Sequence, residues 1–382
     1  MSPILVVGHS ARQLARSAMR GGHRVIALDL FGDRDLRAVA ETWATVRRRT
    51  GGIVRFDADD LLDVASRVAP PAAGGGLVYG AGFEDDARLL RVLSSGRELL
   101  GNPADVVERV KDPQALEALA SAAGIPHPVV RNDPPRDPSG WLSKLAGGSG
   151  GGHVVPASRA PDAVEGGLRR YFQRIAAGRA ISALFLADGR DALLVGLSEQ
   201  WTRAPGIDFG FAGATGPVEL APALEGAIRA IVDRFVGASG VRGCCSLDLL
   251  VDGERVVLLE CNPRPPATLD LYDDDWARGL FDAHVAACRG VLPSVAPGPR
   301  EARAFAVVYA PRTMRQPRRF AWPDDCRDVP CAPAGRAEFE AGAPICTVHA
   351  ASASAALARR AVAQRAEDLL QRLQDAAARD AA

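Results

Sequence analysis

The chain lacks the long apolar run that a membrane-spanning helix requires. Such a helix takes about 20 consecutive apolar residues, and no run in the 382-residue sequence approaches that length. The N-terminus, Met-Ser-Pro-Ile-Leu-Val-Val-Gly, also lacks the basic region and the cleavage site of a signal peptide. We therefore expect a cytoplasmic protein that has no membrane partner.

An excess of charge of either sign is also missing. Lysine and arginine total 46, aspartate and glutamate also total 46, and the formal net charge is zero. Nucleic acids attract proteins largely through positive charge, so we expect no nucleic-acid partner. Hydrophobic residues make up 47% of the chain, which excludes general disorder. The length is enough for two or three domains.

Paired cysteines are absent as well. None of the seven cysteines belongs to a Cys-x-x-Cys pair, and Cys244 and Cys245 are adjacent in the chain. We therefore expect neither a disulfide framework nor a zinc site. The cysteines are interpreted as small buried hydrophobic residues.

The N-terminal third predicts a parallel, doubly wound α/β sheet, with strands at 4–7, 24–30 and 76–80 and a helix at 11–20. Asp29 lies where a dinucleotide-binding domain places its ribose-binding acid. The turn after the first strand, however, lacks Gly-x-Gly-x-x-Gly. An NAD-binding oxidoreductase is therefore the least favoured of the alternatives.

The most informative stretch is a predicted β-hairpin at 245–260. Asp252-Gly253 is a strong hairpin-turn signal between two apolar runs. Asp248 lies on the first strand, Glu260 ends the second, and Asn262 points to the same face as Glu260. Burying unpaired carboxylates is costly, and these hard oxygen donors suit Mg²⁺ bound together with phosphates. A solvated acidic hairpin end is the alternative interpretation.

Asp248 and the segment Leu-Leu-Glu-Cys-Asn-Pro-Arg at 258–264 resemble the metal-binding signature of ATP-grasp enzymes. The resemblance implies that Asp248, Glu260 and Asn262 hold two Mg²⁺ ions, which Mn²⁺ could replace, on the phosphates of ATP. It also implies that Arg264 faces an acyl phosphate.

Other segments follow the order of the same superfamily. A lysine, Lys111, precedes a helix capped by Asp112 and a Gly-Ile-Pro-His-Pro turn at 124–128, and Lys144 precedes the glycine run 147–152. Alone, such lysines are usually solvated and such glycines form linkers. The resemblance instead implies ATP phosphate contacts from the two lysines, adenine binding by Gln173, and a mobile lid loop. The lid residues expected to bind ATP are Gly148, Ser149, Gly150 and Gly151.

The resemblance implies an ATP-grasp fold in three parts. These are a Rossmann-like pre-grasp domain at 1–100, the ATP-grasp domain at 101–291 with a lid at about 126–178, and a small β-rich C-terminal domain with a terminal helix at 292–382. We expect helices at 160–170, 221–237, 275–290 (capped by Asp275) and 352–378, and strands at 192–199 and near 206–213. In the terminal helix, the residues expected to face inward are Leu357, Val362, Leu369, Leu370 and Leu373.

The implied function is an ATP-dependent ligase. It would join a small-molecule carboxylic acid to an amine through an acyl phosphate and release ADP. Short matches such as Gly82-Phe83-Glu84 resemble a predicted carboligase branch related to biotin carboxylase. That branch includes a tyramine–glutamate ligase, which suggests a glutamate-adding step in the biosynthesis of a methanofuran-like cofactor. A nucleotide-binding regulatory protein without turnover is the main alternative, and a homodimer is compatible with the sequence.

Overall fold

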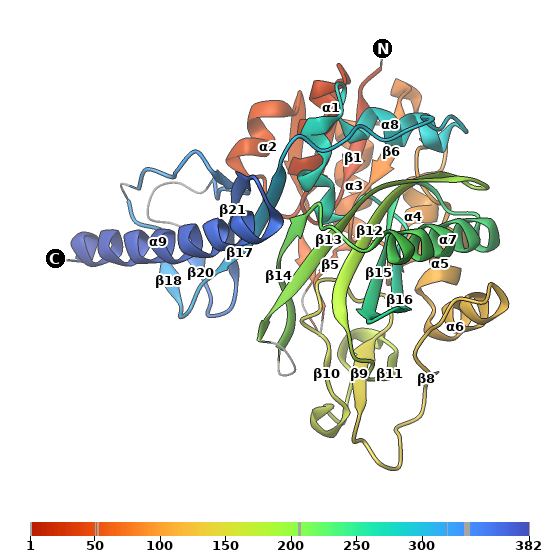
Figure 1. Cartoon of the computed structure of the whole chain (residues 1–382). Helices are drawn as coiled ribbons and strands as arrows, with labels where there is room; N and C mark the ends of the chain where they lie inside the picture. Colours follow the sequence, from red (N-terminus) through yellow and green to blue (C-terminus); the bar gives the residue numbers. More distant parts are fainter. Residues whose placement is uncertain are drawn as a thin grey trace.

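The structure is a computed structural model that describes residues 2–49, 51, 53–204, 208–318, 320–331 and 337–381. It is an α/β protein, with a parallel sheet at the N-terminus and a long antiparallel sheet through its centre (Figure 1). No helix in these described ranges is both long enough and apolar enough to cross a membrane.

The N-terminal sheet is parallel, and its strands lie in the order β3-β2-β1-β6-β7. Strand β1 is buried along its whole length, as is usual for parallel strands covered on both faces. The strands are β1 (Ile4–Val7), β2 (Val25–Asp29), β3 (Thr42–Thr45), β6 (Gly76–Tyr79) and β7 (Glu98–Leu99). The helices are α1 (Arg12–Arg20), α2 (Arg34–Val39), α3 (Ala58–Val68) and α4 (Ala87–Leu93), and β4 (Arg48–Arg49) pairs with β5 (Arg55–Phe56).

The direction in which strands are added to this sheet reverses between β1 and β6. Strands β2 and β3 lie on one side of β1, and β6 and β7 lie on the other. Open α/β sheets bind ligands in the crevice beyond the carboxyl ends of their strands at such a reversal. Here that crevice lies between the loop after Val7 and the loop after Tyr79.

The central sheet has eight strands, in the order β16-β15-β12-β13-β14-β17-β21-β19. The five strands from the middle of the chain are β12 (Arg179–Asp188), β13 (Ala192–Ala204), β14 (Asp208–Gly216), β15 (Arg242–Asp252) and β16 (Arg255–Asn262). The three from the C-terminal part are β17 (Ala302–Tyr309), β19 (Cys326–Arg327) and β21 (Pro344–Ser352). The predicted C-terminal segment therefore shares a sheet with the predicted ATP-grasp domain, and the domain division remains a prediction.

Helices cover this sheet and join it to the N-terminal part. Helix α8 packs against α1, and their side chains share one core that includes Leu14, Ala18, Leu280 and Phe281. The remaining α-helices are α5 (Ala104–Lys111), α6 (Pro113–Ala122), α7 (Pro222–Ser239), α8 (Gly279–Cys288) and α9 (Ala355–Ala381). Single 3₁₀ turns lie at η1 (Pro71–Ala73), η4 (Ala267–Leu271) and η5 (Asp273–Asp275), and β18 (Met314–Arg315) pairs with β20 (Glu338–Phe339).

A small antiparallel sheet projects at one end of the central sheet (Figure 1). Its order is β10-β9-β11-β8, and the predicted lid segment supplies all four strands. They are β8 (Val130–Arg131), β9 (Trp141–Leu145), β10 (Val155–Pro156) and β11 (Arg170–Arg174), and the 3₁₀ turns η2 (Ala157–Arg159) and η3 (Glu165–Gly167) lie between β10 and β11. Strand β10 pairs with β9, so the glycine run at 147–152 is part of a hairpin connection, as predicted.

Three local predictions are wrong. Residues 160–170 form no α-helix, because Gly166 and Gly167 take positive φ angles within a 3₁₀ turn. The helix expected from 275 begins at Gly279, and Asp275 pairs with Arg303 instead of capping it. Leu357 is 48% exposed on α9, although Val362, Leu369 and Leu373 are buried. The strand expected near 206–213 is β14, and residues 205–207 lie outside the described residues.

Candidate active site

The hairpin β15–β16 brings two carboxylates and an amide together. Asp248 lies opposite Glu260 in the strand register, and Ser246 lies opposite Asn262. The Asn262 side chain donates from Nδ2 to Oδ2 of Asp248 at 3.0 Å, and Gln200 donates to Oδ1 of Asp248 at 3.4 Å. This convergence agrees with the sequence pattern, while the metal-binding role of the three residues stays a prediction.

The two carboxylates perturb each other. Burial, followed by the charge of Glu260, raises the pKa of Asp248 to about 7. Burial also acts to raise the pKa of Glu260, but Lys111 and Lys144 more than offset this and lower it below its ordinary value. The Glu260 side chain keeps 38% of its surface exposed. A divalent cation between the two carboxylates would relieve their repulsion.

Lys111 reaches this acidic end from the last turn of α5. Its Nζ lies 3.7 Å from Oε2 of Glu260 and donates to the backbone carbonyl of Cys261 at 3.2 Å. The Asp112 side chain caps α6 by accepting the backbone N–H groups of Gln114 and Ala115, as the sequence predicts. The break between α5 and α6 at Asp112 thus leaves Lys111 at a helix end beside the hairpin.

Lys144 approaches from the lid sheet and is held by Gln173. Its Nζ donates to Oε1 of Gln173 at 2.6 Å, across the pair of strands β9 and β11. Burial lowers the pKa of Lys144, which Glu260 partly counteracts. Gln173 is itself buried, so it is no ordinary surface glutamine. Its role in binding adenine stays a prediction.

The sequence contains only two lysines, Lys111 and Lys144, against 44 arginines. Both lie close enough to Glu260 to shift its pKa. Lysine is a compact point charge with three donors, whereas arginine is a planar fork, so the two do not substitute for each other at a phosphate. A chain that uses arginine almost everywhere thus places its lysines only at this site, a signal that residue counting could have found.

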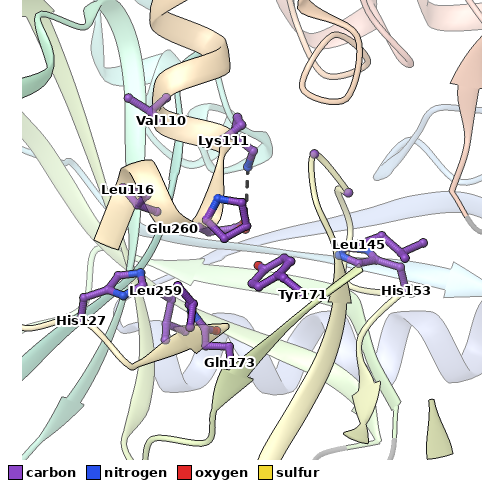
Figure 2. Close-up of a pocket in the computed structure, with 14 residues that line it drawn as sticks. Val110, Lys111, Leu116, His127, Leu145, His153, Tyr171, Gln173, Leu259 and Glu260 are labelled. Carbon is purple, nitrogen blue, oxygen red and sulfur yellow. Dashed lines mark ion pairs between the residues drawn. The ribbon is translucent and has the colours of Figure 1, made fainter. Parts of the chain in front are cut away.

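Of these residues, Lys111, Gln173 and Glu260 line one pocket between the lid sheet and the central sheet (Figure 2). Figure 2 shows the ion pair between Lys111 and Glu260, with Tyr171 near the middle and Gln173 beside Leu259. The lining of the pocket is partly charged and partly apolar, as a phosphate-bearing heterocycle requires. Its apolar residues include Pro113, Leu116, Val130 and Leu259.

The glycine loop packs tightly against both walls of the cleft. A Cβ on Gly147 would overlap the backbone of Asp85, and one on Gly151 would overlap the carbonyl oxygen of Phe209. The backbone N–H of Phe211 on β14 donates to the carbonyl of Gly150 at 2.8 Å. These contacts hold the loop against Asp85 and β14, and at Gly147 and Gly151 only a residue without a side chain allows them.

Some backbone groups of this loop are already hydrogen-bonded to other parts of the protein chain and are not free to contact a phosphate. The N–H of Gly148 donates to the carbonyl of Leu145 at 3.1 Å, and the carbonyl of Gly151 accepts from Val154. Among the described residues, no backbone acceptor is recorded for the N–H groups of Ser149, Gly150 and Gly151. Of the four loop residues predicted to bind ATP, these three therefore keep an N–H that could face a phosphate.

Arg264 is held by a residue that the sequence had not marked as part of the site. Its Nε donates to Oε1 of Glu84 at 2.8 Å, and both side chains are almost fully buried. The second oxygen of Glu84 accepts the backbone N–H groups of Gly82 and Phe83. A further contact links Arg264 to Oδ1 of Asn262 at 3.3 Å. The N-terminal domain thus orients the arginine predicted to face the acyl phosphate.

The sequence also gave no role to His153, which follows the glycine run. It lines the pocket, and a side chain on Gly148 would overlap its ring. Burial lowers the pKa of His153 to about 4, so the imidazole is neutral near pH 7. Its Nδ1 is shielded and has no hydrogen-bond partner within the described part of the chain.

The dinucleotide alternative finds no support in the geometry of Asp29. Its side chain accepts the backbone N–H groups of Ala11, Phe31 and Gly32. These bonds occupy both carboxylate oxygens, and Asp29 is fully buried. It therefore stabilises the loop after β2 and is not open to a ribose.

The candidate metal ligands include an amide side chain as well as carboxylates. Within the described ranges, no three His, Cys, Asp or Glu side chains are grouped so that they could hold an ion. The two carboxylates and the Asn262 amide do, however, fit Mg²⁺, which keeps several water ligands and is commonly bound by one or two carboxylates plus substrate phosphates. The donor set is therefore consistent with Mg²⁺ that binds together with ATP.

Comparison with known proteins identifies the domain. Residues 113–268 match the model of the ATP-grasp domain. The carbamoyl phosphate synthase large chain of Thermus thermophilus is 28% identical over 238 residues, and that of Rubrobacter xylanophilus is 23% identical over 281. These matches cover 55% and 65% of this chain but only 22% and 25% of the relatives, so the chain spans about a quarter of their length.

Solved structures resemble the whole chain. The biotin carboxylase domain of 2-oxoglutarate carboxylase from Hydrogenobacter thermophilus, solved with MgADP and bicarbonate, has a TM-score of 0.72 at 13% identity, with 94% of this chain and 89% of that chain covered. N5-carboxyaminoimidazole ribonucleotide synthetase from Thermus thermophilus has a TM-score of 0.66 at 18% identity, with 97% and 98% covered. These likenesses show the fold, which is the ATP-grasp fold predicted above. The match at 113–268 shows that this part of the chain is an ATP-grasp domain.

Proposed function

We propose that this protein is an ATP-dependent ligase that joins a carboxylic acid to an amine and releases ADP and phosphate. The observation that carries the proposal is the meeting of the chain's only two lysines with Glu260 at the end of β16. A pocket lined by Lys111, Glu260 and several apolar residues, with Lys144 held by the lining residue Gln173 and Asp248 opposite Glu260, is suited to a nucleoside triphosphate with its metal. The sequence relatives and the structural neighbours are consistent with an ATP-grasp ligase.

In this proposal, Asp248, Glu260 and Asn262 would hold Mg²⁺, two ions by analogy with the superfamily. The metal would neutralise the charge of the ATP phosphates. Lys111 and Lys144 contribute fixed positive charge as the γ-phosphoryl group moves to the substrate carboxylate, which is catalysis by position and electrostatics. Arg264, fixed by Glu84, would contact the acyl phosphate.

The lid excludes water from that intermediate. An acyl phosphate is hydrolysed by water, so closure over the site protects it until the amine arrives. The closed packing of Gly147 and Gly151 against the two walls supports this role. A glutamate-adding step in the synthesis of a methanofuran-like cofactor, a cytoplasmic location and a homodimer remain finer predictions within the proposal.

The test is ADP release by the purified protein with Mg²⁺ and ATP, across a panel of acids and amines that includes glutamate with tyramine-like amines. Release that requires both an acid and an amine, and that is lost in Glu260→Gln, would support the ligase. Glu254→Gln, on the exposed turn of the same hairpin, is the matched control. Tight ATP binding without turnover on any pair would favour the regulatory alternative, and equal activity of Glu260→Gln would rule out its metal role.

A further inference from the structure

A second pocket lies in the N-terminal domain at the carboxyl end of its parallel sheet. Strand β5 supplies Arg55 and Phe56, and the loop after β6 supplies Gly82 and Asp85. Arg49 on β4 lies at the same pocket. It shares no lining residue with the pocket of Figure 2. Its position beside the crevice between β1 and β6 is where an open α/β sheet binds a ligand.

Four charged residues line this pocket, Arg49, Arg55, Asp85 and Asp86. Asp86 caps α4 by accepting the N–H of Leu89, and Arg55 and Asp85 are not hydrogen-bonded to each other. Arg55 Nε lies 3.8 Å from Oδ2 of Asp85, which is too long for a hydrogen bond. That nitrogen is shielded from solvent and has no hydrogen-bond partner among the residues that the structure describes. The Asp85 side chain is only 6% exposed, and burial raises its pKa to about 6 despite the nearby Arg55. Buried polar groups in native proteins normally have partners, so both groups have capacity for a ligand of mixed charge.

The pocket lies next to the expected acyl phosphate. Asp85 directly follows Glu84, whose carboxylate holds Arg264 at 2.8 Å. The glycine loop of the lid packs on the backbone of Asp85 through Gly147. Arg55 also donates to the carbonyl of Gly166, in the lid, at 3.2 Å. The lid therefore borders both pockets, and a ligand in the second one would lie beside the reacting centre.

We propose that this pocket binds a free amino acid as the amine substrate, with its carboxylate on Arg55 and its ammonium group on Asp85. The inference rests on the proposed ligase function and adds the class of amine. A ligand with one charge would contact either the shielded Nε of Arg55 or the buried carboxylate of Asp85, but not both. A ligand with both charges, held on a short backbone, satisfies the two at once.

The chemistry follows from this placement. The ammonium group gives a proton to the Asp85 carboxylate, and the free amine nitrogen attacks the carbonyl carbon of the acyl phosphate. The C–N bond forms, the bond from that carbon to the phosphate oxygen breaks, and inorganic phosphate leaves with the second proton that the nitrogen loses as it becomes an amide. The pKa of Asp85, raised to about 6, suits a group that takes a proton near neutral pH. Phe56 and Gly82 form an uncharged wall for the amino-acid side chain.

The test is calorimetric titration of the full chain, loaded with ADP and Mg²⁺, with each of the standard protein amino acids. We expect at least one to bind, and its N-acetylated and carboxamide forms to bind at least 10-fold more weakly. Arg55→Met and Asp85→Asn should each weaken binding of the parent amino acid by a similar factor. Arg67→Met, on the exposed face of α3, is the control that should bind normally.

The outcomes separate the two proposals. Failure of the wild-type protein to bind ADP would contradict the proposed function itself. Normal ADP binding without binding of any amino acid would overturn only this inference. Equal binding of the parent, acetylated and amidated ligands would also overturn it, and this comparison needs no variant, so it holds even if Arg55→Met or Asp85→Asn fails to fold.

Discussion

Glu84 and Arg264 form a buried ion pair at 2.8 Å, although 180 residues separate them in the chain. Through this pair, the N-terminal domain fixes the arginine that we expect to face the acyl phosphate. Removing one partner of a buried pair leaves the other charge uncompensated, which typically costs about 3–5 kcal/mol.

We expect Glu84→Gln to lower the ligase rate by roughly 10- to 100-fold, because a displaced Arg264 no longer meets the reacting group. The KM for ATP should change little, since Glu84 does not line the nucleotide pocket. Steady-state ADP release measures both quantities. Glu98→Gln, which breaks an exposed pair with Arg289, is the matched control, and an equal fall in that variant would show that the effect is not specific.

The same pair predicts how stability depends on pH. Burial acts to raise the pKa of Glu84, but Arg264 and Lys111 more than offset this and lower it from 4.5 to about 2. The stabilisation is therefore full above the unfolded pKa of 4.5 and is lost as the pH falls toward 2. The free energy of unfolding in urea, measured across this window, should fall by roughly 3 kcal/mol more in the wild type than in Glu84→Gln. Parallel curves would contradict the ionised pair.

Lys144→Ala should weaken ATP binding by roughly 10- to 100-fold, since a hydrogen bond to a charged group contributes about 1.5–3 kcal/mol. Calorimetry with ATP and Mg²⁺ measures the effect.

Because the chain has only two lysines, an amine-reactive reagent should label Lys111, Lys144 and otherwise only the N-terminus. ATP should protect both lysines; labelling of Lys144 at the same rate in saturating ATP would place it outside the nucleotide site.

Gly151→Ala should prevent the lid from closing. Gly151 has a φ of +73°, and a Cβ there would overlap the carbonyl oxygen of Phe209. We expect uncoupled ATP hydrolysis to rise relative to ligation, because water reaches the intermediate when the lid stays open. The neighbouring Gly152 offers a matched control, since its Cβ would meet nothing within 4 Å. The same ratio of hydrolysis to ligation in the Gly151 and Gly152 variants would contradict this role of the loop.

Asp33→Asn should stabilise the protein at high pH. Asp33 is 4% exposed, and its Oδ2 has no hydrogen-bond partner in the described part of the chain. Burial, followed by Asp328, raises its pKa from 3.8 to about 8. Ionisation therefore favours the unfolded state, and wild-type stability falls as the pH rises from 3.8 to 8.

The gain of Asp33→Asn in unfolding free energy should grow over that range to at most about 6 kcal/mol. Denaturant unfolding at several pH values measures it. Asp59→Asn, on the solvent side of α3, should show no such trend. A constant difference between Asp33→Asn and the wild type would mean that Asp33 is ionised in the folded protein.

The hairpin and its acids could be predicted from the sequence because their signals are local. Asp252-Gly253 sets the turn, and the strand period places Glu260 and Asn262 on one face. The first strand, at 4–7, and the cap at Asp112 were predictable for the same reason. Each of these features depends on residues a few positions apart.

The contacts that were missed join residues far apart in the chain. Nothing near Glu84 indicates that Arg264 is its partner, and nothing near Lys144 indicates the bond to Gln173. Strand β3 was missed because its four residues are exposed or half-buried, so they carry no apolar run. Its place in the sheet comes from pairing with β2, which is a tertiary interaction.

Because the central sheet is continuous, the C-terminal segment cannot be removed without exposing the edge of a strand. Strand β17 covers the outer side of β14 through the pairs from Gly213 to Gly216, and β21 continues from β17. Truncation before residue 300 would leave β14 with a row of bare N–H and C=O groups, and such a strand recruits another chain and aggregates. The last 80 residues therefore protect the edge of the central sheet, and shortened versions of the protein should keep them.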